Sequence, residues 1–175
     1  MDMYIYGKLG NLTMTKEGIN VLMTNLTGKV PPILQRLDYI RFNGEAAGYL
    51  HDLTLTGLFH TGAGMVKTDV MMSIDEQSMS RTYSGSVASA DLDLGKLLNQ
   101  EKKFGKVDFN VELKGFNYKN RYPESYIKGI ISSFEYSQYQ YENIMLDGVY
   151  KDGGFNGRLS MDDANGSVQI DGNFN

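Results

Sequence analysis

The sequence of 175 residues predicts an all-β protein, an antiparallel meander of amphipathic strands with one or two short helices. The strands form either a curled sheet or trough (β-taco-like) or a sandwich. Two observations carry this prediction. Apolar and polar residues alternate over many short segments, and the composition combines 20 glycines with only three prolines, with Tyr and Phe as the only aromatic residues.

Alternation with a period of two is typical of strands that have one dry and one wet face. It is clearest at residues 53–56, 66–70, 107–113 and 168–171. Parallel α/β folds show continuous apolar strands alternating with long helices instead, and this sequence has neither. The alternation therefore favours an antiparallel sheet with one buried face.

A second pattern, apolar-x-apolar-x-Gly, recurs across the chain. Its glycines are Gly44, Gly57, Gly115, Gly148 and Gly172. Because glycine releases a strand into a turn or bulge at little steric cost, we expect each of these strands to end there. The Asp-Gly-Gly at 152–154 and the Asn-Gly at 165–166 predict tight hairpins, giving a meander of about ten or more strands.

Only two stretches are predicted to be helical, at residues 31–37, with proline near the first helical position, and at residues 91–100. So little helix leaves the apolar face of the sheet without a cover. The sheet must curl on itself, pack on a second sheet or bind an apolar ligand.

Several function classes are excluded or disfavoured by composition. The net charge is −4, and the basic residues are scattered among acids, which argues against nucleic acid. With no cysteine there is no disulfide or thiolate site. The two histidines, His51 and His60, lack the spacing of metal ligands or of a catalytic triad. We therefore expect no enzyme activity, no catalytic residue, no cofactor and no metal.

Three loop-like segments each allow two interpretations. The glycine-rich stretch 57–64 lacks the Lys-Ser/Thr of a phosphate-binding loop and predicts a hairpin connection. Asp162-Asp163-Ala164-Asn165-Gly166 resembles a calcium loop without the full set of ligands, and an Asx-closed turn is favoured. The aromatic tract 134–141 is either a sugar- or protein-binding platform or, the favoured interpretation, a pair of strands.

Four passages in the second half share a pattern with known envelope proteins. They are Asp91-Leu92-Asp93-Leu94-Gly95-Lys96-Leu97-Leu98, the strand 104–115, the stretch 127–150 and the hairpin 154–166. In order and spacing they resemble the AsmA/TamB family (AsmA-like and TamB-like bacterial envelope proteins), particularly its Bacteroidetes members. Ala164 stands where that family usually has proline.

The resemblance implies a segment of a bridge-like lipid-transfer protein. Such proteins hold the acyl chains of phospholipids in a hydrophobic β groove in the periplasm, and they support outer-membrane biogenesis with an outer-membrane assembly partner. The parent chain would be anchored in the inner membrane of a Gram-negative bacterium. Since Met1-Asp2-Met3-Tyr4 has neither a basic nor an apolar leader region, we expect this sequence to be a piece of a longer chain.

Residues 1–175 are expected to form a single β-rich segment, with halves 1–90 and 91–175 as the alternative and the family resemblance strongest in 91–175. The acyl chains would lie against Val107, Phe109, Val111, Leu113, Ile144, Leu146, Val168 and Ile170. The rival interpretation is a non-enzymatic structural or interaction module of the cell envelope, a β-sandwich whose apolar face is its own core. A carbohydrate-binding module that uses the region 136–141 is the third alternative.

Overall fold

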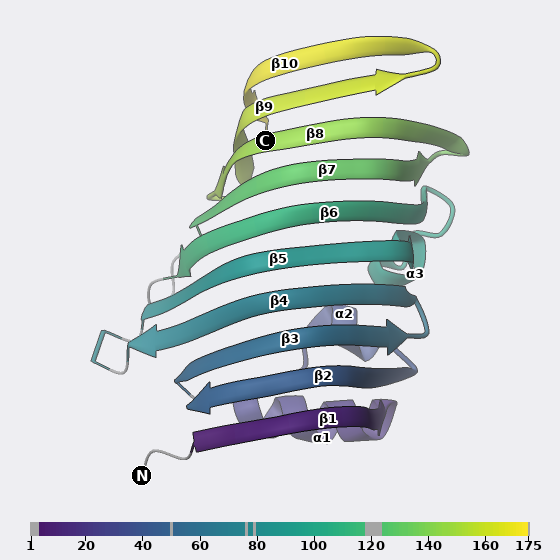
Figure 1. Cartoon of the computed structure of the whole chain (residues 1–175). Coiled ribbons are helices and arrows are strands. Elements are labelled where there is room, and N and C mark those ends of the chain that lie inside the picture. The colour runs from purple at the N-terminus through teal and green to yellow at the C-terminus, as the bar shows by residue number, and fades with distance from the viewer. Residues whose placement is uncertain (1–3, 50, 76, 79, 118–123, 175) are drawn as a thin grey trace.

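A single antiparallel sheet makes up most of the molecule. The computed structural model describes residues 4–49, 51–75, 77–78, 80–117 and 124–174. Within them ten strands pair in strict sequence order, each antiparallel to the next, which confirms the all-β meander. No second sheet packs on the first in the described part of the chain, so the curved-sheet alternative is the one that forms, and the sandwich is not (Figure 1).

The ten strands are long, between nine and 14 residues each. In chain order they are β1 (Tyr4–Thr15), β2 (Tyr39–Tyr49), β3 (Asp52–Thr61), β4 (Gly64–Asp75), β5 (Ser80–Asp93), β6 (Phe104–Asn117), β7 (Glu124–Tyr136), β8 (Tyr139–Lys151), β9 (Gly154–Asp163) and β10 (Gly166–Phe174). The boundary between residues 90 and 91 lies inside β5, which pairs with β4 and β6 along its length.

Three helices lie on one face of the sheet, α1 (Lys16–Thr27), α2 (Pro32–Gln35) and α3 (Leu94–Leu98). The sequence predicted α2 and α3, but the prediction of only two helical stretches was wrong, because α1 was missed. Its signals were present. Thr15 caps the helix by accepting a hydrogen bond from the Gly18 amide, and Gly28 ends it in the left-handed conformation at φ 75°. Its many Thr, Asn and Gly residues obscured this pattern.

The recurrent glycines do not end strands as expected. Gly44, Gly57 and Gly148 lie well inside β2, β3 and β8, and the ladder continues past them. Gly44 and Gly57 face each other across β2 and β3, and the ring of Phe42 lies over both, so a Cβ at Gly57 would come within 2.6 Å of that ring. These glycines therefore make room for an aromatic side chain on the face of the sheet.

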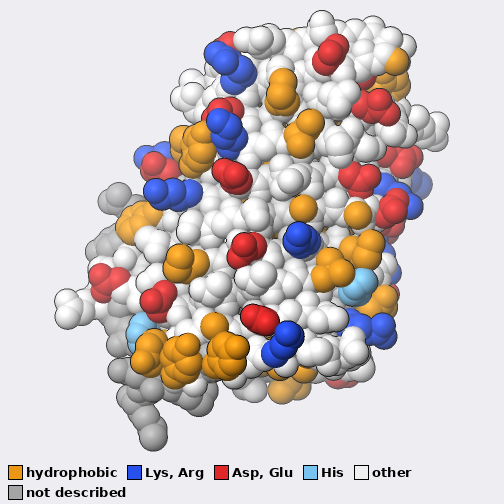
Figure 2. All heavy atoms as spheres, in the orientation of Figure 1, with side chains coloured by type: hydrophobic (Ala, Val, Ile, Leu, Met, Phe, Trp, Pro, Cys, Tyr) orange, Lys and Arg blue, Asp and Glu red, His pale blue; other side chains and the backbone are white. Residues whose placement is uncertain are grey.

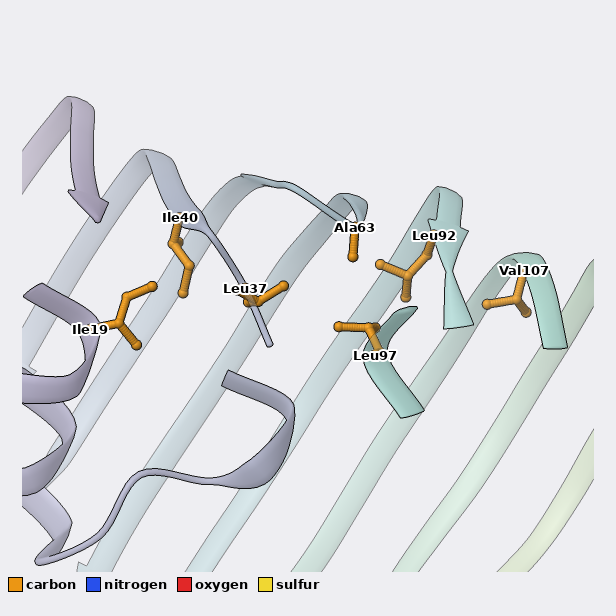
Figure 3. Close-up of a cluster of buried hydrophobic side chains, with 7 residues drawn as sticks. All are labelled: Ile19, Leu37, Ile40, Ala63, Leu92, Leu97 and Val107. Atoms are coloured by element: carbon orange, nitrogen blue, oxygen red, sulfur yellow. The ribbon is translucent and has the colours of Figure 1, made fainter. Parts of the chain in front are cut away.

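The strand registers divide the side chains into two faces. The face that carries the helices, here called the helix face, holds the apolar members of each alternating pair, and the opposite face, here called the polar face, holds the charged ones. A buried cluster fills the space between helices and sheet (Figure 3) and consists of Ile19, Leu37, Ile40, Ala63, Leu92, Leu97 and Val107. Ile19, with 1% of its surface exposed, is its most enclosed member.

Candidate apolar binding face

The helix face carries continuous apolar rows that cross the second half of the sheet. One row runs from β5 to β10 through Val87, Val111, Gly129, Leu146, Leu159 and Ile170. The next row contains Gly85, Leu113, Ile127, Gly148, Gly157 and Gly172. Because every side chain in these rows points to one side, β5–β10 present one broad apolar surface.

All eight residues named from the sequence as lipid-facing lie on the helix face. Val107 and Ile144 are buried, and Val107 belongs to the cluster beneath α3, with Phe109 packed against it. The side chains of Val111, Leu113 and Leu146 are half-buried. Val168 and Ile170 are 41% and 42% exposed. The structure therefore places the eight on one surface but divides them between a covered and an uncovered part.

Over β5–β10 the helices cover only one end of this face. The clustered sheet residues Ile40, Leu92 and Val107 lie where β2 and β6 begin and β5 ends, and α3 packs there against β6 while α1 packs against β1 and β2. This is the right-hand end of the sheet in Figure 1, where α3 is seen behind the strands. The part of the helix face on β5–β10 beyond the cluster is called the open apolar face below.

Some members of the open apolar face were not named from the sequence. They are Val87, Ile127, Leu159, Phe155 and Met161. Alternation over 155–161 was the available signal for the last three, since Phe155, Leu159 and Met161 share one face. For Ile127 the available signal was Ile131, four residues further along the chain and on the same face of the strand.

Few polar groups interrupt this surface. Tyr83 lies across Gly115, which has no side chain to block it, and its hydroxyl forms a hydrogen bond with the Ser125 hydroxyl two strands away. Next to this surface, on β4, the buried Oγ1 of Thr68 has no hydrogen-bond partner among the described residues. Almost the whole surface therefore offers only apolar contacts, which do not fix the orientation of a ligand.

The aromatic tract forms two strands, as favoured. Its residues make the β7–β8 hairpin, which turns at Ser137 and Gln138. Phe134 and Tyr141 face each other there with ring centroids 6.3 Å apart, and Tyr139 meets Tyr141 edge-on at 4.6 Å. Tyr136 is 38% exposed. The rings thus pack mainly on one another, and glycan binding by this region stays a prediction.

The acidic loop at 162–166 is an Asx-closed turn. The Asn165 amide donates to Asp163 Oδ1 at 2.8 Å, and the Tyr139 hydroxyl donates to Asp163 Oδ2 at 3.0 Å. The glycine-rich stretch 57–64 forms the expected hairpin, with Gly62 and Ala63 between β3 and β4. Across the described residues, no group of three or more His, Asp or Glu side chains is arranged to hold a metal ion.

The polar face carries a row of charges that alternate in sign, which the sequence alone did not reveal. Glu112, Lys128, Asp147, Arg158 and Asp171 are successive partners from β6 to β10. Lys128 Nζ lies 3.3 Å from Asp147 Oδ2, and Arg158 Nε lies 2.9 Å from Asp171 Oδ1. The hydroxyl of Tyr126 and the ammonium of Lys128 lower the pKa of Asp147. Figure 2 shows this face, with charges of both signs spread over it.

None of the described helices is long and apolar enough to cross a membrane. The longest has 12 residues. No protein-family model, curated protein or solved structure matches this chain at a significant level. The function must therefore be argued from the two faces of the sheet.

Proposed function

We propose that this chain is a wall segment of a bridge-like lipid-transfer protein that holds the acyl chains of phospholipids against its open apolar face. The proposal includes a periplasmic location, a parent chain anchored in the inner membrane and a role in outer-membrane biogenesis with an outer-membrane assembly partner. These parts rest on the sequence resemblance to the AsmA/TamB family. The binding of acyl chains rests on the open apolar face itself.

The observation that supports acyl-chain binding is the incomplete cover of the helix face. Apolar rows continue from the buried cluster across β5–β10, but over these strands α3 packs only at one end. Each methylene group moved from water to an apolar surface contributes about 0.8 kcal/mol. An acyl chain lying across Leu113, Leu146 and Leu159 would therefore gain several such contributions, and it would remove those side chains from water.

The arrangement also favours movement along the sheet. In the row from Val87 to Ile170 every strand except β7, which has Gly129 there, offers an apolar side chain, and neighbouring strands lie about 4.8 Å apart. With almost no hydrogen-bonding group on this surface, nothing fixes a chain at one strand. A lipid would slide from strand to strand with small changes in free energy, and no catalytic residue is needed.

Two neighbouring residues provide a matched test. Leu146 belongs to the open apolar face, while Met145 points to the polar face and is 56% exposed. The variants Leu146→Asp and Met145→Asp introduce the same charge one residue apart. Native mass spectrometry and fluorescence titration with vesicles of phosphatidylethanolamine and phosphatidylglycerol would measure binding to the wild type and to both variants.

We expect Leu146→Asp to weaken lipid binding by at least about tenfold, since a carboxylate among acyl chains is costly. Met145→Asp should bind as the wild type does. Circular dichroism and thermal unfolding establish that both variants are folded. If the wild type binds no phospholipid, or if both variants bind equally well, the open apolar face is not a lipid site, and a structural or interaction role of the single sheet is then favoured.

A further inference from the structure

A groove lies on the polar face above β5, in the middle of the sheet. Between residues 82 and 88 the side chains that β5 presents on this face are all small, and they are Thr82, Ser84, Ser86 and Ala88. The neighbouring strands carry longer side chains there, since Met71 on β4 and Lys114 on β6 lie on the two sides of Ser84. The small residues of β5 therefore form the floor of the groove, and longer side chains of β4, β6 and β7 form its walls.

The groove consists of two cavities that share part of their lining. Each has a volume of about 560 Å³, which is within the range of small-molecule sites. The shared residues are Met71, Ser84, Lys114 and Tyr126. From them one cavity continues to Phe116, and the other continues to Asp69 and Glu112. The floor from Thr82 to Ser86 is about 13 Å long, so the groove has room for a short oligomer.

The walls of the groove carry exposed apolar side chains. Met71, Phe116 and Tyr126 are 50%, 45% and 40% exposed. The Tyr126 hydroxyl donates to Asp147 Oδ1 at 2.7 Å, and Asp147 does not line the groove. This hydrogen bond holds the ring in place beside the groove. A ring held in this way can pack against the C–H groups of a ligand with little loss of conformational freedom.

The polar groups of the groove include both donors and acceptors. Among the described residues, no hydrogen bond or ion pair joins the hydroxyls of Ser84 and Ser86 or the ammonium of Lys114 to another side chain. Asp69 accepts one hydrogen bond, from the Thr56 hydroxyl at 2.9 Å, and keeps further acceptor sites. The groove can therefore both donate hydrogen bonds to a ligand and accept them from it.

A neutral oligosaccharide matches this combination of groups. Each sugar hydroxyl donates and accepts, so it can bond to Lys114 and to a carboxylate at once, while the C–H face of the ring packs on an aromatic side chain. The acids Asp69 and Glu112 beside Lys114 disfavour an anion. A wholly apolar ligand would cover Lys114 and Asp69 without giving them a partner, which is costly.

We propose that this groove binds a short neutral oligosaccharide, with one sugar ring packed on Tyr126 and its hydroxyls bonded to Lys114 and to the acids of the second cavity. The groove lies on the face that Figure 2 shows, opposite to the open apolar face. This inference therefore does not depend on lipid binding, and Leu146→Asp should leave it unchanged.

An array of neutral and acidic glycans, probed with the 175-residue chain, tests the class of ligand. We expect retention on neutral oligosaccharides. Isothermal titration calorimetry with the best-retained one should give an affinity that is the same at low and high salt, since a neutral ligand brings no charge to be screened. A chain that retains no glycan overturns the proposal, and so does retention of acidic glycans alone.

Two substitutions on β5 test the place of binding. Ser84→Phe fills the floor of the groove, whereas Ala88→Phe puts the same ring on the same face of the strand outside the groove lining. Ser84→Phe should weaken glycan binding at least about tenfold, a loss of about 1.4 kcal/mol, and Ala88→Phe should leave it unchanged. Circular dichroism and thermal unfolding establish that both variants are folded. Equal binding by the two variants would show that the groove is not the site.

The role of the aromatic ring has its own matched pair. Tyr6 lies on the same face as Tyr126 and is 73% exposed, but it does not line the groove. Tyr126→Ala should weaken glycan binding at least about fivefold, because the packing of the ring on the sugar is lost. Tyr126→Phe keeps the ring and should retain most of the affinity, and Tyr6→Ala should bind as the wild type does. Unchanged binding by Tyr126→Ala would contradict the proposed packing.

Discussion

The covered and open ends of the helix face are built from the same kind of strand but differ in what lies over them. At the covered end Ile19, Leu37 and Leu97 are between 1% and 8% exposed. On the edge strand β10, which no helix covers, Val168 and Ile170 are 41% and 42% exposed. Alternation of apolar and polar residues therefore places apolar side chains on one face of every strand. It does not supply the second layer that would shield those side chains from water.

The cover depends on how the strands are connected. α1 and α2 lie in the connection between β1 and β2, and α3 lies in the connection between β5 and β6. From β7 to β10 the connections are two-residue turns, such as Asp152 and Gly153 between β8 and β9. Turns of this length cannot contribute side chains to a second layer. Over β7–β10 the open apolar face thus follows from short hairpins between long strands.

The largest expected difference between the two ends concerns their contribution to stability. Leu92 on β5 is 7% exposed and belongs to the buried cluster, while Leu113 on β6 is half-buried on the open apolar face. Leu92→Ala should lower the free energy of unfolding by about 3 kcal/mol, because it leaves a cavity among helix and sheet side chains. Leu113→Ala should cost about 1 kcal/mol, since solvent can fill the space. Urea unfolding followed by circular dichroism measures both.

If Leu92→Ala and Leu113→Ala lowered the free energy of unfolding equally, the proposed difference between the covered and the open part of the helix face would be wrong. Equal losses would mean that Leu113 is as well packed as Leu92, and that something covers the open face in solution. Repeating the Leu113→Ala measurement in the presence of phospholipid vesicles separates a lipid cover from a protein one, because only a lipid cover makes the loss depend on added vesicles.

The recurrent glycines give a second contrast, of intermediate size. At Gly44 a Cβ would come within 2.7 Å of the Phe42 ring and also against the backbone of β3, whereas at Gly172 no atom lies within 4 Å of the added carbon. Gly44→Ala should therefore destabilise the protein by well over about 1 kcal/mol. Gly172→Ala should be neutral or slightly stabilising, because alanine loses less backbone entropy on folding. Thermal unfolding compares the two, and a stable Gly44→Ala variant would show that β2 and β3 can separate locally.

Much of the fold could be predicted from the sequence because the alternation is a local signal. The strands at 53–56, 66–70, 107–113 and 168–171 each carry it within a few residues, and the hairpins at 152–154 and 165–166 carry their own turn residues. The glycines inside strands could not be understood this way. Whether Gly57 ends a strand or lies beneath Phe42 depends on a residue of another strand, which only the register brings near.

The candidate site could be predicted only in part. The eight apolar residues named from the sequence do share one face, since a period of two places them there. Which of them are covered could not be predicted, because the cover of Val107 comes from Leu97 and its neighbours on α3. The charged row from Glu112 to Asp171 could not be predicted either, since it joins residues from five strands.

The smallest expected difference concerns two ion pairs, one at the covered end of the helix face and one on the polar face of β9 and β10. Lys96 on α3 donates from Nζ to Asp38 Oδ2 at 2.8 Å. This hydrogen bond and the positive charge of Lys96 lower the pKa of Asp38, and the hydrogen bond and the negative charge of Asp38 raise the pKa of Lys96. The ion pair links α3 to the chain before β2. On the polar face of β9 and β10, Arg158 lowers the pKa of Asp171 in the same way, but this pair contacts no helix.

Because the pKa of Asp38 is lower in the folded protein, its stabilising contribution is present above its ordinary pKa and is lost as the pH falls through the lowered value. Asp38→Asn should remove this part of the acid dependence of unfolding, and Asp171→Asn should do the same for its own pair. Only Asp38→Asn should also speed amide exchange in α3 at neutral pH, because only there does the ion pair hold part of the cover. Hydrogen exchange read by NMR measures this. Unchanged exchange in α3 would mean that apolar contacts of Leu97, and not the ion pair, keep the helix on the sheet.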